Sequence, residues 1–183
     1  MDTQARALWV FLTAIILVFA LPASAWGQLS GTPESVNRRQ GIWASAGLGG
    51  GAGGEGGFGA VTSGNFAAGW TVNPRVLVGV GSTAVREPAD RTMVTAGTLD
   101  ARVQFYPDAY AGFFATAGLG LGWFRMDDSG SGPNVGGGIM AGLGYDFRVA
   151  QSLNITTYLN GFAFHTPDPR GHALAFGLGL AWH

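Results

Sequence analysis

Cysteine and lysine are both missing from this sequence, and each absence excludes a kind of chemistry. None of the 183 residues is a cysteine, so the chain has no disulfide, no thiolate nucleophile and no cysteine-bound metal. All ten basic residues are arginine, so no lysine can form a Schiff base or hold a nucleotide phosphate in a P-loop. Functions that depend on these groups are therefore excluded.

Charge is also scarce, while glycine is abundant. Only 11% of the residues are charged, against roughly 25% in a typical soluble domain, and 32 are glycine. A soluble surface is difficult to build from this composition. The formal net charge of −1 provides no basic face for nucleic acid, so we expect no nucleic-acid partner.

The N-terminus has the pattern of an export signal. Arg6 precedes an apolar run over residues 7–21, and Pro22 and the small-x-small segment 23–25 follow it, which predicts a secretory signal peptide cleaved after Ala25. The alternative is an uncleaved membrane anchor, but a spanning helix needs about 20 apolar residues, and the run over 7–21 is shorter than that. Residues 26–40 lack periodicity and are expected to be a periplasmic lead-in to a domain over 41–183. That domain has no helical membrane span, so any further crossing must use β-strands.

The last stretch, 171–183, shows how such a crossing would be built. Its two faces differ sharply, because successive side chains of a strand point in opposite directions. One face holds only glycine and alanine from residue 173 to 181, and the other holds Leu174, Phe176, Leu178, Leu180 and Trp182. Large apolar groups toward lipid and small groups toward a narrow interior are typical of a transmembrane barrel.

The whole domain divides into segments of this kind. Alternating patterns predict strands over 41–49, 58–72, 76–86, 92–106, 110–123, 135–148, 153–164 and 171–183. Short turns at 73–75, 107–109 and 149–152 alternate with longer connections at 50–57, 87–91, 124–134 and 165–171. We therefore predict an all-β fold, an eight-stranded antiparallel up-and-down transmembrane β-barrel, with turns in the periplasm and loops outside the cell.

Aromatic residues are expected to form two interfacial girdles at the strand ends. Segment 153–164 departs from the alternation at its end, because Phe162 and Phe164 fall on its polar side. The predicted girdle residues are Trp43, Trp70, Phe105, Tyr106, Tyr110, Tyr145, Phe147 and Trp182 at the periplasmic end, with Phe58, Trp123 and Phe124 at the other.

Two Asp-x-Arg pairs, Asp100 with Arg102 and Asp146 with Arg148, are predicted to point into the lumen near the periplasmic end. Buried charges need partners, so we expect an ion-pair network that fills the barrel. The alternative hypothesis is a gate, in which breaking the pairs opens a narrow path for small solutes. Eight strands leave an interior just wide enough for side chains, so no open pore is expected.

Four further arginines, Arg86, Arg91, Arg125 and Arg170, come at or just beyond the outer strand ends. The guanidinium fork suits phosphate, which predicts contacts with outer-leaflet lipid, including lipopolysaccharide. The alternative is ordinary solvated loop charge.

Signals for catalysis, cofactors and metals are thin. Glycines at 49, 51 and 54 match a dinucleotide fingerprint, but no helix follows them, and the acidic segment 127–132 lacks the final glutamate of a calcium loop. The segment from Phe164 to Thr166 resembles the His-x-Ser segment of lipid A deacylase barrels, but Pro167 stands at the position of the serine. We therefore expect no enzyme, no cofactor and no metal site.

The motifs Asn73-Pro74-Arg75, Phe105-Tyr106-Pro107, 142–148 and 177–182 together resemble the small outer-membrane β-barrel proteins of Gram-negative bacteria, of the OmpA and OmpX type. This resemblance implies location in the outer membrane and insertion by its assembly machinery, which recognises a terminal aromatic residue; here Trp182 is penultimate and His183 is last, which departs from that pattern. It implies a non-enzymatic structural or surface-interaction role, and we expect a monomer. The alternatives are a small gated pore, a secreted lipocalin-like binder and, last, a lipid-modifying enzyme.

Overall fold

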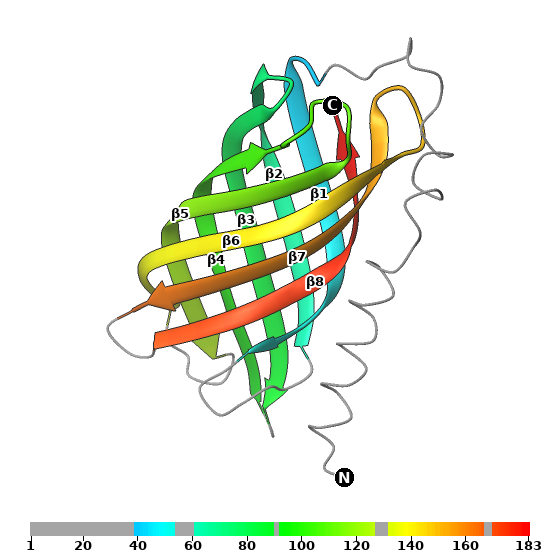
Figure 1. The fold of residues 1–183 in the computed structure, drawn as a ribbon. Helices are drawn as coiled ribbons and strands as arrows, with labels where there is room; N and C mark the ends of the chain where they lie inside the picture. The colour runs from blue at the N-terminus through cyan, green and yellow to red at the C-terminus, as the bar shows by residue number, and fades with distance from the viewer. Residues whose placement is uncertain (1–38, 54–60, 90–91, 127–131, 167–169) are drawn as a thin grey trace. The chain divides into compact units, whose positions relative to one another are not determined.

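The computed structural model describes residues 39–53, 61–89, 92–126, 132–166 and 170–183, which form a closed barrel (Figure 1). Every strand pairs antiparallel with its neighbours in sequence, and β1 pairs with β8. In these ranges no helix is long and apolar enough to cross a membrane. The predicted signal peptide, 1–25, and all but the last two residues of the lead-in lie outside the described residues. The strands are β1 Ile42–Gly53, β2 Val61–Asn73, β3 Val76–Ala89, β4 Thr92–Phe105, β5 Phe113–Met126, β6 Asn134–Arg148, β7 Leu153–His165 and β8 Arg170–Trp182.

The predicted fold class is confirmed. The strand boundaries at the loop end of the barrel differ from the prediction. Connections 74–75, 106–112 and 149–152 define the turn end, and 54–60, 90–91, 127–133 and 166–169 define the loop end. Residues 50–53 were predicted to be loop but extend β1, because their backbone pairs with β8, and residues 50 and 51 also pair with β2. The strands include many residues that were predicted to be loop, so connection 90–91 is no longer than turn 74–75. The predicted contrast in connection length is therefore largely wrong.

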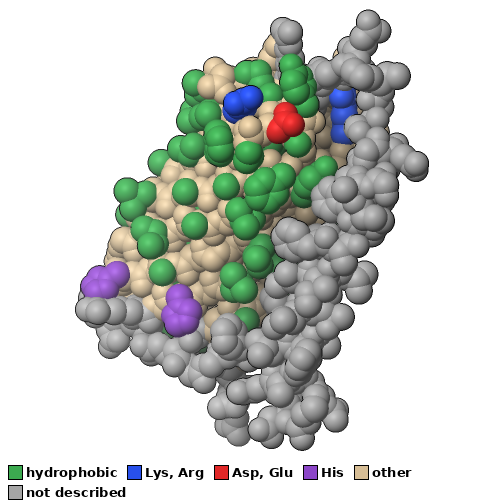
Figure 2. Space-filling model, viewed as in Figure 1, with side chains coloured by type: hydrophobic (Ala, Val, Ile, Leu, Met, Phe, Trp, Pro, Cys, Tyr) green, Lys and Arg blue, Asp and Glu red, His purple; other side chains and the backbone are tan. Residues whose placement is uncertain are grey.

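Bulky apolar side chains cover the outside of the barrel. Leu119 in the middle of β5 is 70% exposed, and the alternate residues of β4, such as Leu99 and Val103, are exposed as well. Figure 2 shows hydrophobic side chains across one face, with charged and histidine side chains only near its two ends. Such a surface is stable in lipid rather than in water.

The lumen is filled in three layers. An apolar turn-end cluster consists of Trp43, Ala67, Leu77, Tyr106 and Phe114. A polar middle layer separates it from an apolar loop-end cluster, which consists of Val61, Val85, Ala96, Met140, Phe162, Phe164, Ala173 and Ala175, with Phe124 packed against it. The prediction that small residues fill the interior is therefore incomplete, because large apolar side chains close both ends.

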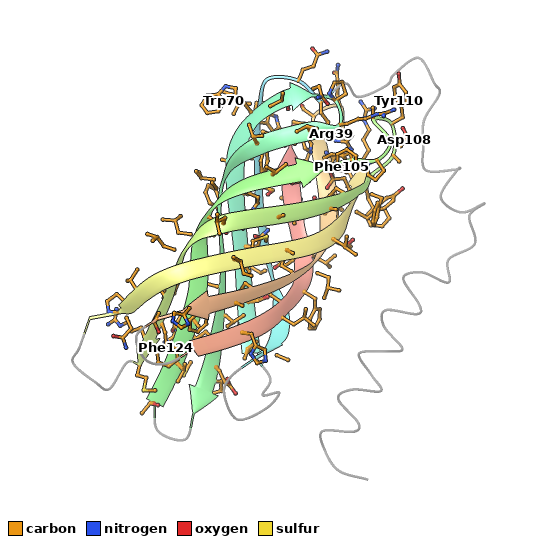
Figure 3. The ribbon with its side chains drawn as sticks, turned by 60° about the vertical axis from the view of Figure 1, so that its left-hand side comes forward. Arg39, Trp70, Phe105, Asp108, Tyr110 and Phe124 are labelled. Carbon is orange, nitrogen blue, oxygen red and sulfur yellow. The ribbon has the colours of Figure 1, made fainter. Side chains whose placement is uncertain are left out.

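Three of the predicted girdle aromatics point inward instead. Trp43 is 1% exposed and its Nε1 donates to the Val78 carbonyl at 3.3 Å, while Tyr106 and Phe124 belong to the lumen clusters. Other aromatic side chains are exposed at the turn end as predicted, among them Trp70 and Tyr110 (Figure 3). The predicted girdle residue Phe58 lies outside the described residues.

If lipid surrounds the middle of the barrel, the cost of an outward charge there can be predicted as a change in the free energy of unfolding. We expect Leu119→Arg to lower the free energy of unfolding by about 2–4 kcal/mol, and the control Val72→Arg near the turn end by about 0–1 kcal/mol, because the cost of a charge in lipid depends on depth. Urea unfolding in phospholipid vesicles measures both. Equal costs at the two positions would contradict a lipid-facing band.

Candidate functional site

An ion pair occupies the centre of the polar middle layer. Asp100 and Arg102 lie two residues apart on β4, so both side chains point inward. They are 2% and 3% exposed. Arg102 Nε lies 2.9 Å from Asp100 Oδ1, and Nη2 lies 3.1 Å from Oδ2. This is the two-pronged arrangement that makes guanidinium–carboxylate pairs strong and directional.

Neighbouring strands supply the remaining hydrogen bonds of this pair. Arg102 donates from Nη1 to Asn65 Oδ1 at 2.9 Å and from Nη2 to Thr83 Oγ1 at 3.3 Å. Thr98 Oγ1 donates to Asp100 Oδ2 at 3.1 Å. These bonds link the neighbouring strands β2, β3 and β4 along the inner wall of the barrel. A buried ion pair is retained only when its spare donors and acceptors are satisfied in this way.

A second polar group lies at the turn end around Asp146. The Tyr106 hydroxyl and Thr156 Oγ1 each donate to its carboxylate at 2.6 Å, and His183 Nε2 lies 3.4 Å from Oδ2. Gln104 Nε2 in turn donates to the Tyr106 hydroxyl at 2.6 Å. Burial, with the nearby charge of Asp146, raises the pKa of Tyr106 well above its usual value. The hydroxyl therefore stays protonated and keeps its bond to the carboxylate.

Arg39 covers this group from the turn end. Its guanidinium carbon lies 3.4 Å from the centre of the Tyr106 ring, and it donates to the carbonyls of Ala109 and Ala111 at 3.0 and 2.9 Å. Figure 3 places Arg39 beside the end of β4 that carries Phe105. Residues 26–40 were predicted only as a periplasmic lead-in, and the sequence gives no signal for Arg39, because the residue lies outside the alternating strands.

The two Asp-x-Arg pairs do not behave alike. Arg148 is exposed, and its guanidinium donates to the carbonyls of Ala150 and Gln151 at 3.3 Å each. Its predicted place in the lumen is wrong, because β6 ends at this residue and the long side chain folds over the following turn. Asp146 is bound instead through Tyr106 and Thr156, which come from other segments of the chain.

The lumen contains a small cavity with a largely polar lining. The volume open to water centres is about 20 Å³, which is enough for about one water molecule. Two residues that line this cavity each have a buried polar atom, the Tyr158 hydroxyl and Asn160 Oδ1, with no hydrogen-bond partner among the described residues. Within the described ranges, no three His, Asp or Glu side chains are grouped to hold a metal ion.

Two of the predicted phosphate-binding arginines lie in one row at the loop end. Arg86 of β3 and Arg125 of β5 both pair with Thr95 of the intervening β4, and both arginines are exposed. Arg91 and the side chain of Arg170 lie outside the description. The predicted assembly signal Trp182 is 49% exposed at the end of β8, where it faces outward beside Leu153 and Ala44.

Comparison with solved structures identifies the architecture. Neisserial surface protein A is 16% identical over 77% of this chain and 96% of its own, with a TM-score of 0.59. Ail, the attachment invasion locus protein of Yersinia pestis, is 15% identical over 78% of this chain and 99% of its own, with a TM-score of 0.53. No protein-family model and no curated protein sequence matches the chain.

The chain has the fold of a small outer-membrane β-barrel protein. At identities of 14–16%, the similarity to these proteins shows a shared fold alone. It assigns no site residues, because one fold can host many functions. In this small barrel polar side chains lie in the lumen, and the exposed arginines lie at both ends, with Arg86 and Arg125 at the loop end and Arg75 and Arg148 at the turn end.

The central ion pair is expected to stabilise the barrel strongly once formed. Arg102→Ala leaves the Asp100 carboxylate buried without its charged partner, so we expect the free energy of unfolding to fall by about 3–5 kcal/mol. Urea unfolding in vesicles measures this change. Arg75→Ala, an exposed turn substitution, is the control and should change the value by less than about 0.5 kcal/mol. Equal effects of the two variants would show that the pair contributes nothing.

Proposed function

We propose that this protein is a non-enzymatic β-barrel of the outer membrane, with a structural or surface-interaction role in the cell envelope. The observation that carries the proposal is the combination of an apolar exterior with a lumen sealed by apolar clusters at both ends. A lipocalin-like binder would need the reverse, with an apolar cavity inside and polar cover outside. The lumen cavity beside Tyr158 and Asn160 holds about one water molecule, which is too little for a lipocalin-type ligand.

The proposed orientation places the turn end in the periplasm and the loop end outside the cell. β1 starts and β8 ends at the turn end, so a chain delivered by a signal peptide over residues 1–25 can insert without moving either strand terminus across the membrane. Trp182, exposed on the lipid side at the end of β8, is the proposed signal for the assembly machinery. We propose a monomer in this membrane.

Placement of the loop-end histidine supports a non-enzymatic role. His165 ends β7 with its side chain exposed on the outer face, and its neighbour in register is Arg170 of β8. A general base acts on a nucleophile within hydrogen-bond reach. The sequence has Pro167 where the resembling deacylase segment has its serine, and proline carries no nucleophilic group.

Cell fractionation tests the proposed location. We expect the protein to stay in the outer-membrane fraction after a carbonate wash, because its lipid-facing band cannot be exposed to water. Without heating it should also migrate anomalously on a detergent gel, because a closed barrel resists unfolding by detergent. Recovery in the soluble periplasmic fraction would overturn the proposal.

A small gated pore is the second candidate, and the polar cavity favours it. Tyr158 and Asn160 leave buried polar atoms beside this cavity, so bound water is expected there. A path through the barrel would have to continue from that water past Phe164 at the loop end and past Trp43 at the turn end.

Conductance in planar bilayers separates the two candidates. We expect no current steps from the native protein, and none from Arg102→Ala, because that substitution leaves both apolar clusters in place. Arg75→Ala serves as the control for insertion and handling. Current steps that appear in Arg102→Ala alone would support the gate and contradict a purely structural role for the pair.

A further inference from the structure

One shallow trough interrupts the apolar exterior described above. Its volume is about 590 Å³, and outward-facing residues of four adjacent strands form it. Small residues of β1, β2 and β3 make the floor, and larger side chains stand around it. The outward residues are Ala46, Leu48, Gly64, Phe66, Ser82, Ala84, Leu178 and Leu180.

Steric crowding does not explain the glycine in this floor. A Cβ added to Gly64 would meet only Leu48 Cδ2, at 3.8 Å, which is ordinary contact. At many lumen glycines, in contrast, the added atom would overlap a neighbouring side chain or backbone. The open floor at Gly64 is therefore a feature of the surface and not a requirement of barrel closure.

The trough leads directly to the exposed arginines of the loop end. Ser82, Ala84 and Arg86 lie at alternate positions of β3, so all three face outward, and Arg86 is about 7 Å beyond Ala84. Arg86 and Arg125 lie on either side of Thr95 at a backbone separation of about 10 Å, which is twice the spacing of adjacent strands. Two guanidinium groups and one hydroxyl thus point to the same side of the barrel.

We propose that this surface is a binding site for a phosphorylated lipid of the outer leaflet, with one acyl chain in the trough and a phosphate between Arg86 and Arg125. Each guanidinium has five N–H donors, so it can bind phosphate oxygens beside its contacts within the chain. The hydroxyl of Thr95 adds a neutral donor between the two charges. The site rests on the proposed outer-membrane location, because only there does this face meet such a lipid.

Charge favours a lipid over a second copy of the chain in this trough. In a two-fold dimer the same patch of both copies meets, and in a membrane both copies have the same orientation. Arg86 and Arg125 of one copy would then approach the same arginines of the other, and like charges repel. An anionic lipid instead provides the opposite charge at the depth of the arginines and apolar chain at the depth of Gly64 and Ala84.

Native mass spectrometry of the full chain in non-ionic detergent tests the site, with hexa-acylated lipid A carrying two phosphates as the probe. We expect the native protein to retain one lipid. The double variant Arg86→Gln, Arg125→Gln should bind it about tenfold or more weakly, because it loses charge-assisted hydrogen bonds. The control Arg75→Gln, Arg148→Gln removes two exposed arginines at the turn end and should bind as the native protein does.

The trough is tested separately by filling it. Gly64→Leu occupies the floor without a backbone clash and should weaken binding several-fold, because the acyl chain loses its packing contacts. Gly137→Leu is the matched control, since Gly137 is exposed on β6 and an added Cβ there meets nothing within 4 Å. Heat-modified migration on detergent gels confirms that each variant is folded.

Several outcomes would overturn the site. Equal binding by all four variants would indicate unspecific lipid solvation. Displacement by inorganic phosphate, together with unchanged binding in Gly64→Leu, would indicate a simple anion site, and a dimer that Gly64→Leu disrupts would indicate a second copy in the trough. These measurements use purified protein, so they fail or succeed independently of the fractionation that tests the cellular location.

Discussion

The width of an eight-stranded lumen is the constraint on which this structure depends, because it admits side chains but little else. The chain meets it by placing several of its inward side chains against glycines on adjacent or next-adjacent strands, where even a methyl group would overlap. Glycine is thus abundant because the lumen has too little volume for larger residues opposite these side chains. This holds in the polar layer and in the apolar layers. The pairs are Tyr158 with Gly47 and Gly177, Phe164 with Gly122 and Gly171, Arg102 with Gly81, Asp100 with Gly118, and Phe114 with Gly144.

The same constraint explains which parts of the fold could be predicted from the sequence. The sequences of β4 and β8 predict both where each strand runs and which side chains face lipid, because one face is bulky and the other is small or polar. β1 does not, since alanine, serine and glycine occupy most positions on both faces, and Trp43 was therefore assigned to the lipid side. Gly50 to Gly53 carry no pattern at all, and only the neighbouring strands determine that they are extended.

The candidate site was predictable to the extent that it depends on one strand. Asp100 and Arg102 share a face at two-residue spacing, so their pairing follows from β4 alone. Asp146 has the same spacing to Arg148, but its partners come from the register with Thr156 and from Tyr106 beyond β4. A register between distant segments is not encoded in local alternation. The capping contacts of Arg39 and His183 are hidden for a related reason, since both residues lie outside the strands.

A filled interior also determines where this barrel can act. Most lumen side chains bind or pack against one another, and the cavity beside Tyr158 and Asn160 holds about one water molecule, so recognition there would require breaking a buried ion pair or displacing an aromatic cluster. Either change costs several kcal/mol before any ligand contact is made. The outer face needs no such rearrangement. Its trough and arginine row are already open, and in the proposed location lipid would fill that surface, so the proposed selectivity only requires that one lipid fit better than its neighbours.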